Sequence, residues 1–144
     1  MLDAMRLVAT ESIPAFADVC DERMAAAGLR AFGRIAEAWG LSVDEQLVLL
    51  GQPARSTFFA WRQHPEKARL SRDTLERLSN LLGIYKALQI LLPEPAAADA
   101  WVRQPNSAEA FGGRSALERM LAGNVGDLNF VRRYLDGVRG GGWS

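Results

Sequence analysis

Apolar residues recur along this chain at three- and four-residue intervals, the spacing that places side chains on one face of an α-helix. β-branched residues are scattered, and no stretch alternates apolar with polar positions for long. A half-buried strand requires such alternation. The sequence therefore predicts an all-α fold.

The pattern of apolar residues in the first part of the chain predicts two helices that meet at Gly28. Because glycine commonly follows the last helical residue, we expect Gly28 to end the first helix and Gly40 the second. The first helix covers about residues 14–27, with an apolar face formed by Phe16, Val19, Cys20, Met24 and Ala27. The second covers about residues 29–39, with an apolar face formed by Leu29, Phe32, Ala36 and Trp39.

Two short helices follow. Ser42 and Glu45 form a capping box, which makes this the best-marked helix start in the sequence. Gly51 closes that helix. We expect Gln52 to cap the next helix and Pro53 to occupy its first position, with the helix running to about Gln63.

A long helix over about residues 72–92 is predicted to begin after Ser71. Its apolar surface is wide and consists of two stripes, Leu75, Leu78, Leu82 and Tyr85, and Leu81, Ile84, Leu88 and Leu91. One small neighbour does not cover such a surface. The helix is either central to the core or also forms a homodimer interface, and we favour the second interpretation.

The C-terminal part predicts a short helix ending near Arg103, a loop, and two further helices. Ser115 and Glu118 form a second capping box, and the last helix, about 127–138, opens on Asp127. We expect three regions. Residues 1–28 form an N-terminal helical extension, residues 29–93 a helix-turn-helix and dimerisation region, and residues 94–144 a C-terminal domain with a glycine-rich tail.

Composition narrows the possible chemistry. One cysteine, Cys20, and one histidine, His64, supply no zinc ligand set, and we expect no metal and no cofactor. No apolar run is long enough to span a bilayer, and no secretory signal pattern opens the chain, so we expect a cytoplasmic protein without membrane contact.

Charge is uneven although the formal net charge is zero. Residues 1–50 carry four basic and eight acidic side chains, whereas residues 51–91 carry seven basic and three acidic ones. The middle segment is therefore the candidate anion-binding region. A solvated helix face without a ligand remains the alternative.

The two short helices around Gly51 have the pattern of a helix-turn-helix. Phe58 and Trp61 are spaced to anchor the second helix on the core. This leaves an outer side for contacts with DNA bases, formed by Arg55, Ser56, Phe59, Arg62 and Gln63. Lys67, Arg69 and Arg72 are placed for backbone phosphates. A helical hairpin that does not bind DNA remains possible.

Catalytic patterns are weak. The stretch Phe111 to Ser115 lacks the preceding strand and the lysine of a phosphate-binding loop, so we interpret it as a turn and helix cap. We interpret His64 as a surface residue at a helix end and Cys20 as a buried apolar residue. No catalytic residue is expected, and the chain is not expected to be an enzyme.

The string W-V-R-Q-P-N-S-A-E-A-F-G-G-R-S-A-L-E-R-M-L-A-G, Trp101 to Gly123, resembles the Xre/MbcA/ParS class of type II antitoxins. It matches the family pattern of Trp, Pro-Asn and a Phe-Gly-Gly turn into a short leucine-rich helix. The segment Leu82 to Pro93 is also similar to the family's connecting helix. Ala116 departs from the pattern, which commonly has proline there, and Ser115 still caps the helix.

The resemblance implies a bifunctional repressor. Family members neutralise a RES-domain toxin, an enzyme that consumes NAD, by covering its active site, and they bind their own operator, usually as dimers. The implied DNA-binding residues are Arg55, Ser56, Thr57 and Arg62, beside Gln63, Lys67 and Arg69. The expected toxin-binding residues are Trp101, Asn106, Phe111, Gly112, Arg114, Arg132, Arg133, Trp143 and Ser144.

The ending R-G-G-G-W-S allows two interpretations. Trp143 either folds back onto the last helix or enters the partner's cleft as an aromatic anchor, with Ser144 at an anion site. The whole chain also allows two alternatives to an antitoxin: a stand-alone transcription regulator whose C-terminal domain senses a ligand, and a dimerisation module that does not bind DNA.

Overall fold

The computed structural model describes residues 22–140, and within this range the protein consists of helices and contains no β-strand. The predicted all-α fold is confirmed. No helix in this range is long and apolar enough to cross a membrane. The first helix includes residues 22–39 and is followed by α2 (Val43–Leu49), α3 (Arg55–Gln63), α4 (Arg72–Leu91), α5 (Pro95–Ala100), α6 (Ala116–Met120) and α7 (Val125–Arg139).

Residues 22–39 form one continuous helix, so the prediction that Gly28 ends a helix is wrong. Gly28 lies on the buried face of this helix, where an added Cβ would stand 3.5 Å from Cδ1 of Leu78 in α4. Glycine costs about 1 kcal/mol relative to alanine inside a helix, and tertiary packing routinely outweighs such a local preference. The boundary expected after residue 28 therefore falls inside a helix.

The continuous helix also changes which side chains are buried. Phe32, Ile35 and Trp39 are at most 3% exposed and fix the rotation of the helix about its axis. Met24 is consequently turned outward and is 66% exposed, although we predicted it on the apolar face. Ala27 is exposed as well, and the buried positions are Ala25 and Ala26. Phe16, Val19 and Cys20 lie outside the described residues.

The predicted capping boxes are confirmed. The Ser42 hydroxyl accepts the Glu45 N–H at 3.1 Å, while the Glu45 carboxylate accepts the Ser42 N–H at 2.9 Å. The Ser42 N–H lowers the pKa of Glu45; burial opposes this shift and Arg103 reinforces it. Ser115 and Glu118 form the equivalent pair in front of α6. Ser71 caps α4 as expected.

Two helix starts differ from the prediction. α3 begins at Arg55 after Ala54, which provides no side-chain cap, so the Gln52 cap and the start at Pro53 are wrong. α7 begins at Val125 after Asn124, two residues before the predicted start at Asp127. Asp127 lies in the first turn of α7, where a carboxylate is still favourable near the helix dipole.

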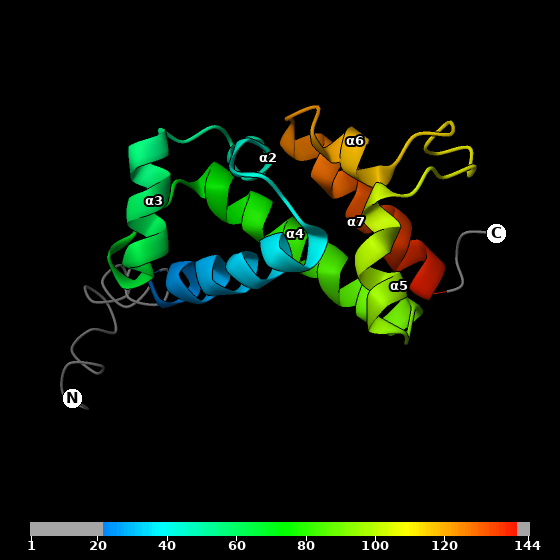
Figure 1. Cartoon of the computed structure of the whole chain (residues 1–144), viewed down its shortest axis with the longest axis horizontal. Helices are drawn as coiled ribbons and strands as arrows, with labels where there is room; N and C mark the ends of the chain where they lie inside the picture. Colours follow the sequence, from blue (N-terminus) through cyan, green and yellow to red (C-terminus); the bar gives the residue numbers. More distant parts are fainter. Residues whose placement is uncertain (1–21, 141–144) are drawn as a thin grey trace, which may run out of the picture.

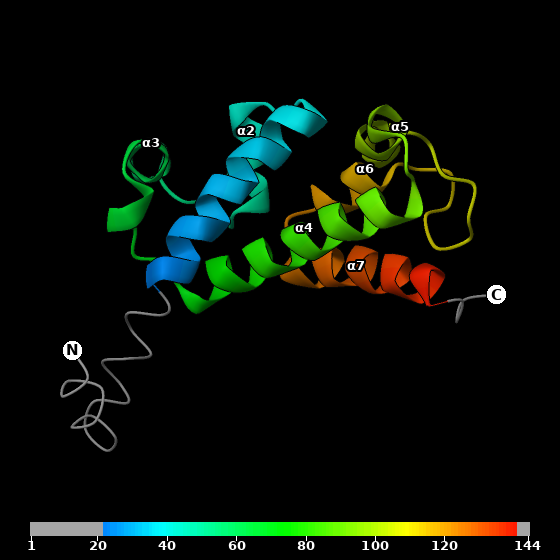
Figure 2. The same cartoon turned by 90° about the horizontal axis from the view of Figure 1, so that it is seen from below.

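Helix α4 is the element on which the other helices pack (Figures 1 and 2). α7 runs alongside α4 in extensive contact with it, and the first helix crosses α4 on another side. α4 contributes Leu78, Leu81, Ile84 and Leu88 to the core, each at most 3% exposed. α7 contributes Leu128, Val131 and Leu135, which are at most 2% exposed. One core therefore joins the N-terminal and C-terminal helices.

Arg77 of α4 links these two halves through its buried guanidinium, with only 8% of the residue exposed. Its Nε donates to Asp73 at 2.8 Å, and its Nη2 donates to the Gly123 carbonyl, just after α6, at 3.0 Å. Nη1 donates to the Val48 carbonyl in α2 at 3.5 Å. A single charged group thus holds α2, α4 and the end of α6 together.

Arg103 makes a second link, at the surface. Its Nε donates to the Trp39 carbonyl at 2.9 Å, and its Nη2 donates to the Gly40 carbonyl at 2.9 Å and to Glu45 at 3.0 Å. The C-terminal part therefore caps the end of the first helix, where carbonyl groups lack helical partners.

We predict that Arg77→Met lowers the free energy of unfolding by about 2–4 kcal/mol, because the charged hydrogen bonds disappear and two carbonyls lose a donor inside the protein. The matched control is Arg55→Met, which removes an exposed ion pair with Asp44 and should cost about 0–1 kcal/mol. Urea denaturation measures both values. Equal losses in the two variants would contradict the role assigned to Arg77.

Candidate functional site

The turn between α2 and α3 depends on two residues with left-handed backbone, Gly51 at φ 94° and Gln52 at φ 62°. The Gln52 N–H donates to the Leu47 carbonyl at 2.7 Å, so Gln52 is part of the turn. An added Cβ at Gly51 would stand 3.0 Å from Asp73 Oδ2 and 3.1 Å from Arg77 Nε. Glycine therefore provides both the backbone angle and the close approach of α4.

Helix α3 presents a well-defined outer side. Phe58 and Trp61 are 2% and 9% exposed and anchor α3 on the core, as predicted. Ser56, Thr57 and Gln63 are exposed. Phe59, which is 40% exposed, lies among these polar residues. The arrangement presents hydroxyl, amide and aromatic groups together, which are side-chain types that contact base edges and thymine methyl groups.

Arg55 and Arg62 are exposed, as the outer side requires, but each also makes a contact within the protein. They lie three residues before and four residues after Phe58, so they flank the buried face of α3. Arg55 pairs with Asp44 of α2 at 2.9 Å. The Arg62 guanidinium lies 5.8 Å from the Phe58 ring centroid and 5.9 Å from that of Phe59.

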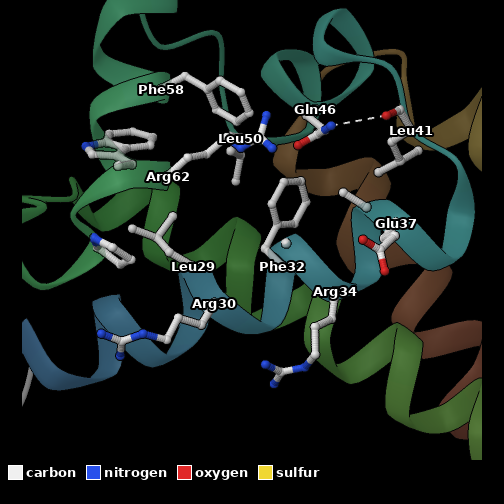
Figure 3. Close-up of a pocket in the computed structure, with 14 residues that line it drawn as sticks. Leu29, Arg30, Phe32, Arg34, Glu37, Leu41, Gln46, Leu50, Phe58 and Arg62 are labelled. Atoms are coloured by element: carbon white, nitrogen blue, oxygen red, sulfur yellow. Dashed lines mark hydrogen bonds between the residues drawn. The ribbon is translucent and has the colours of Figure 1, made fainter.

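Arg62 enters a pocket of about 510 Å³ between the first helix, α2 and α3. Figure 3 shows its side chain reaching toward Leu50, with the Phe32 ring facing the same space. Arg30 and Arg34 also line the pocket, but their guanidinium groups point away from its centre. Sequence spacing indicated the buried face of α3 through Phe58 and Trp61, but it did not reveal the contact of Arg55 with Asp44 or that of Arg62 with the two phenylalanine rings.

The residues expected to contact phosphates lie next to α3. Lys67 ends a 3-10 helix, Pro65–Lys67, and Arg69 and Arg72 follow it; all three are exposed. Arg69 forms an ion pair with Glu22 of the first helix. His64 caps the C-terminus of α3 at the surface, as expected, and its Nδ1 lies 3.4 Å from Glu66.

Four of the expected C-terminal site residues, Asn106, Phe111, Gly112 and Arg114, belong to a closed loop between residues 105 and 115. Pro105 and Ser115 form an isolated antiparallel bridge at its base. The Asn106 side chain accepts the Ala108 N–H at 2.9 Å, so it holds the loop's own backbone. Gly112 and Gly113 have φ values of 57° and 86°, a conformation that side chains disfavour. The Phe-Gly-Gly pattern is thus explained by loop geometry.

Phe111 fastens this loop to the helices and is only 7% exposed. Its ring makes edge-to-face contacts with Trp101, Phe130 and Tyr134, at centroid distances of 6.0, 6.0 and 5.0 Å. The structure therefore places Phe111 inside the protein, where it supports the loop. Trp101 is half-buried beside it.

The other expected toxin-binding residues differ in their accessibility. Gly112, Arg114 and Arg133 are exposed. Arg132 lies across Gly83 of α4, where its Nη1 donates to the Ser79 carbonyl at 3.2 Å, and a Cβ at Gly83 would stand 2.4 Å from Arg132 Nε. Trp143 and Ser144 lie outside the described residues.

Arg119 and Asp127 lie beside the aromatic residues under this loop, although sequence analysis did not identify either as a site residue. Arg119 Nε donates to Asp127 at 2.7 Å, and its guanidinium lies 4.0 Å from the Phe130 ring centroid. Burial raises the pKa of Asp127, but the hydrogen bonds from Arg119 and Asn124 outweigh it, and the pKa is lowered. These residues belong to different helices, so no helical spacing could indicate their contact.

We predict that Gly112→Ala destabilises the protein by about 1–2 kcal/mol, because alanine is strained at positive φ. Gly33→Ala is the matched control. A Cβ added at Gly33 or at Gly112 meets no atom within 4 Å, but Gly33 lies in a helix. There alanine should stabilise by about 0.5–1 kcal/mol. Thermal unfolding tests this difference in sign, and equal shifts would show that the loop does not constrain Gly112.

Two family models match this arrangement. Residues 21–83 match the antitoxin Xre-like helix-turn-helix domain, and residues 87–141 match the antitoxin Xre/MbcA/ParS C-terminal toxin-binding domain. The chain is also 48% identical over 132 residues to the uncharacterized protein y4oB of Sinorhizobium fredii (strain NBRC 101917 / NGR234), covering 92% of this chain and 99% of y4oB. The chain therefore belongs to the Xre/MbcA/ParS family of antitoxins.

Proposed function

We propose that this antitoxin neutralises a RES-domain enzyme that consumes NAD, and that it represses its own operon by binding DNA through α3. The RES class of the partner follows from the resemblance of Trp101 to Gly123 to antitoxins of that system. Neutralisation occurs by covering the enzyme's active site with the C-terminal domain. The chain itself supplies no catalytic group in this proposal.

The observation that carries this proposal is the separation of the two candidate surfaces along α4. α3 lies near the start of α4, and the loop over residues 105–115 lies toward its other end (Figure 1). The 20 residues of α4 span about 30 Å at 1.5 Å per residue. A toxin bound at the loop therefore leaves α3 accessible to DNA.

The DNA-binding surface that we propose is the outer side of α3, with Ser56, Thr57 and Gln63 directed at base edges. Lys67 and Arg69 contact phosphates on one side of α3, and Arg55 does so at its start once it leaves Asp44. Arg62 is exposed at the side of α3, where it lines the pocket, and it contacts phosphates in this proposal.

The toxin-binding surface that we propose is the exposed side of the loop with the neighbouring part of α7. Arg114 and Arg133 supply positive charge there, which suits an enzyme site that binds the phosphates of a dinucleotide cofactor. The Phe111 cluster and the bridge at the base keep the loop in one conformation, and preorganisation of this kind reduces the entropy lost on binding.

We also propose that the protein acts as a homodimer. An open groove lies between the first helix and α4, with Met24, Leu75 and Leu82 among its lining residues. Leu75 and Leu82 belong to one of the two apolar stripes of α4 and are only half-buried. A second copy that covers this groove would complete the burial of that stripe.

Co-expression tests the antitoxin activity directly. We expect this chain to restore growth of cells that express the RES-domain enzyme encoded beside it, and to co-purify with that enzyme. The control is an unrelated helix-turn-helix protein expressed at the same level. If growth is not restored while the chain is folded and abundant, the antitoxin proposal fails and a ligand-sensing regulator becomes the better explanation.

DNA binding is tested with Thr57→Asp. Aspartate in the first turn of α3, which holds no acidic residue, favours the helix but repels DNA, so we expect the affinity for the DNA upstream of the gene to fall at least about tenfold. Ser107→Asp, an equivalent change on the exposed C-terminal loop, is the control and should leave this affinity unchanged. Mobility shifts measure both. Unchanged binding by Thr57→Asp would remove α3 as the DNA-reading helix.

A further inference from the structure

An apolar groove lies where α4 and α7 end side by side. Its volume is about 240 Å³, and all its lining residues are aliphatic or aromatic: Leu88, Leu91, Leu92, Trp101, Tyr134, Leu135 and Val138. Val138 is 39% exposed, and Leu91, Leu92 and Trp101 are half-buried. Within residues 22–140, no charged side chain lines the groove. Exposure of such an apolar surface to water is unfavourable in free energy, so an apolar group that covers the groove is stabilised there.

The chain itself carries a suitable occupant close to the groove. α7 ends at Arg139 with Gly140 as its C-cap, and Trp143 follows three residues after Gly140. Leu135 and Val138 lie five and two residues before Gly140, which corresponds to at most about 8 Å along the helix. Three residues extend up to about 10 Å. Trp143 therefore reaches the groove when the chain reverses direction.

The residues between the end of α7 and Trp143, where the chain must reverse direction, are glycines. Residues 141 and 142 are glycines, a residue type for which left-handed and right-handed backbone conformations are both sterically allowed. The walls of the groove include the rings of Trp101 and Tyr134, and aromatic rings pack favourably edge-to-face or offset. The indole of Trp143 is the largest apolar side chain within this reach and matches the character of the lining.

We propose that the groove is the docking site of Trp143 from the same chain. The short glycine linker gives the indole an effective concentration in the millimolar range, which favours it over a second copy at ordinary protein concentrations. A groove of about 240 Å³ also suits one aromatic side chain better than a whole helix, whose diameter is about 10–12 Å. The docked tail covers the ends of α4 and α7.

Docking of Trp143 in the groove affects how the antitoxin binds its toxin, and this consequence alone rests on the proposed function. A tail whose indole occupies the groove is not free to enter the toxin's active site. The groove and the toxin cleft then compete for one side chain, so the apparent affinity of the tail for the toxin is reduced by the docked fraction. The free antitoxin thus keeps its aromatic anchor covered until the toxin displaces it.

The test uses the full chain without toxin. In a nuclear Overhauser experiment we expect the Trp143 indole to show cross-peaks to the methyl groups of Leu92 and Val138, with the indole signal assigned by its loss in Trp143→Phe. A mixture of chains labelled on indole nitrogen and chains labelled on methyl carbon separates contacts within one chain from contacts between copies. Cross-peaks only within one chain support the proposal.

Two matched variants test the groove itself. Val138→Glu places a carboxylate at the groove, and Ile90→Glu makes the same change at an exposed aliphatic residue of α4 that does not line it. We expect the cross-peaks to be lost in Val138→Glu, with increased relaxation of the indole by a soluble gadolinium reagent, and to persist in Ile90→Glu. Both substitutions are at exposed positions, and amide spectra verify that each variant is folded.

Three results would overturn the proposal: a solvent-exposed indole without cross-peaks to the groove, cross-peaks that survive in Val138→Glu, and cross-peaks between differently labelled copies, which would assign the groove to a second molecule.

Adding the RES-domain enzyme tests separately whether the groove and the toxin compete for Trp143. Loss of the cross-peaks on binding supports competition, whereas their persistence shows that the toxin does not use Trp143. A failure to bind contradicts the proposed function and leaves the docking result unchanged.

Discussion

The buried guanidinium of Arg77 holds together parts of the chain that are distant in sequence, since it binds Asp73, the Val48 carbonyl and the Gly123 carbonyl. A charge in a region of low dielectric is stable only when its hydrogen bonds are satisfied. Gly51 must also be free of a side chain, because Asp73 and Arg77 approach its backbone closely. These contacts fix the position of the α2–α3 turn on α4 and, through Gly123, the end of α6 on the same helix.

Because both halves share α4, they form one cooperative unit with two surfaces. The first helix packs Gly28 against Leu78 of α4, and α7 packs along α4 through Leu128, Val131 and Leu135. In the function that we propose, DNA and toxin bind at opposite ends of this unit. Coupling between the two ligands then depends on how they affect α4 and the dimer, because the two sites need not overlap.

Sequence patterns that involve only a few neighbouring residues predicted the local structure well. The capping boxes at Ser42 and Ser115 are found as expected because each joins residues within one helical turn. The anchors Phe58 and Trp61 are also found as expected, because their spacing of three residues marks one apolar side of α3. The errors arose where tertiary packing decides. Gly28 lies within a continuous helix that packs on Leu78 of α4, and Met24 is exposed because the buried residues further along the helix set its rotation. Phe111 has a place in the sequence pattern, but only its contacts with Phe130 and Tyr134 show that it supports the loop from within.

Amide hydrogen exchange tests most directly whether one scaffold carries two separate binding surfaces. It is measured on the chain alone, on the chain with the RES-domain enzyme, and on the chain with operon DNA. The account predicts that the enzyme adds protection within residues 101–123 and α7 and none in α3. DNA should add protection at the α2–α3 turn and in α3 and none in the loop over residues 105–115. Protection of α3 by the enzyme, or of the loop by DNA, would contradict the separation of the two sites.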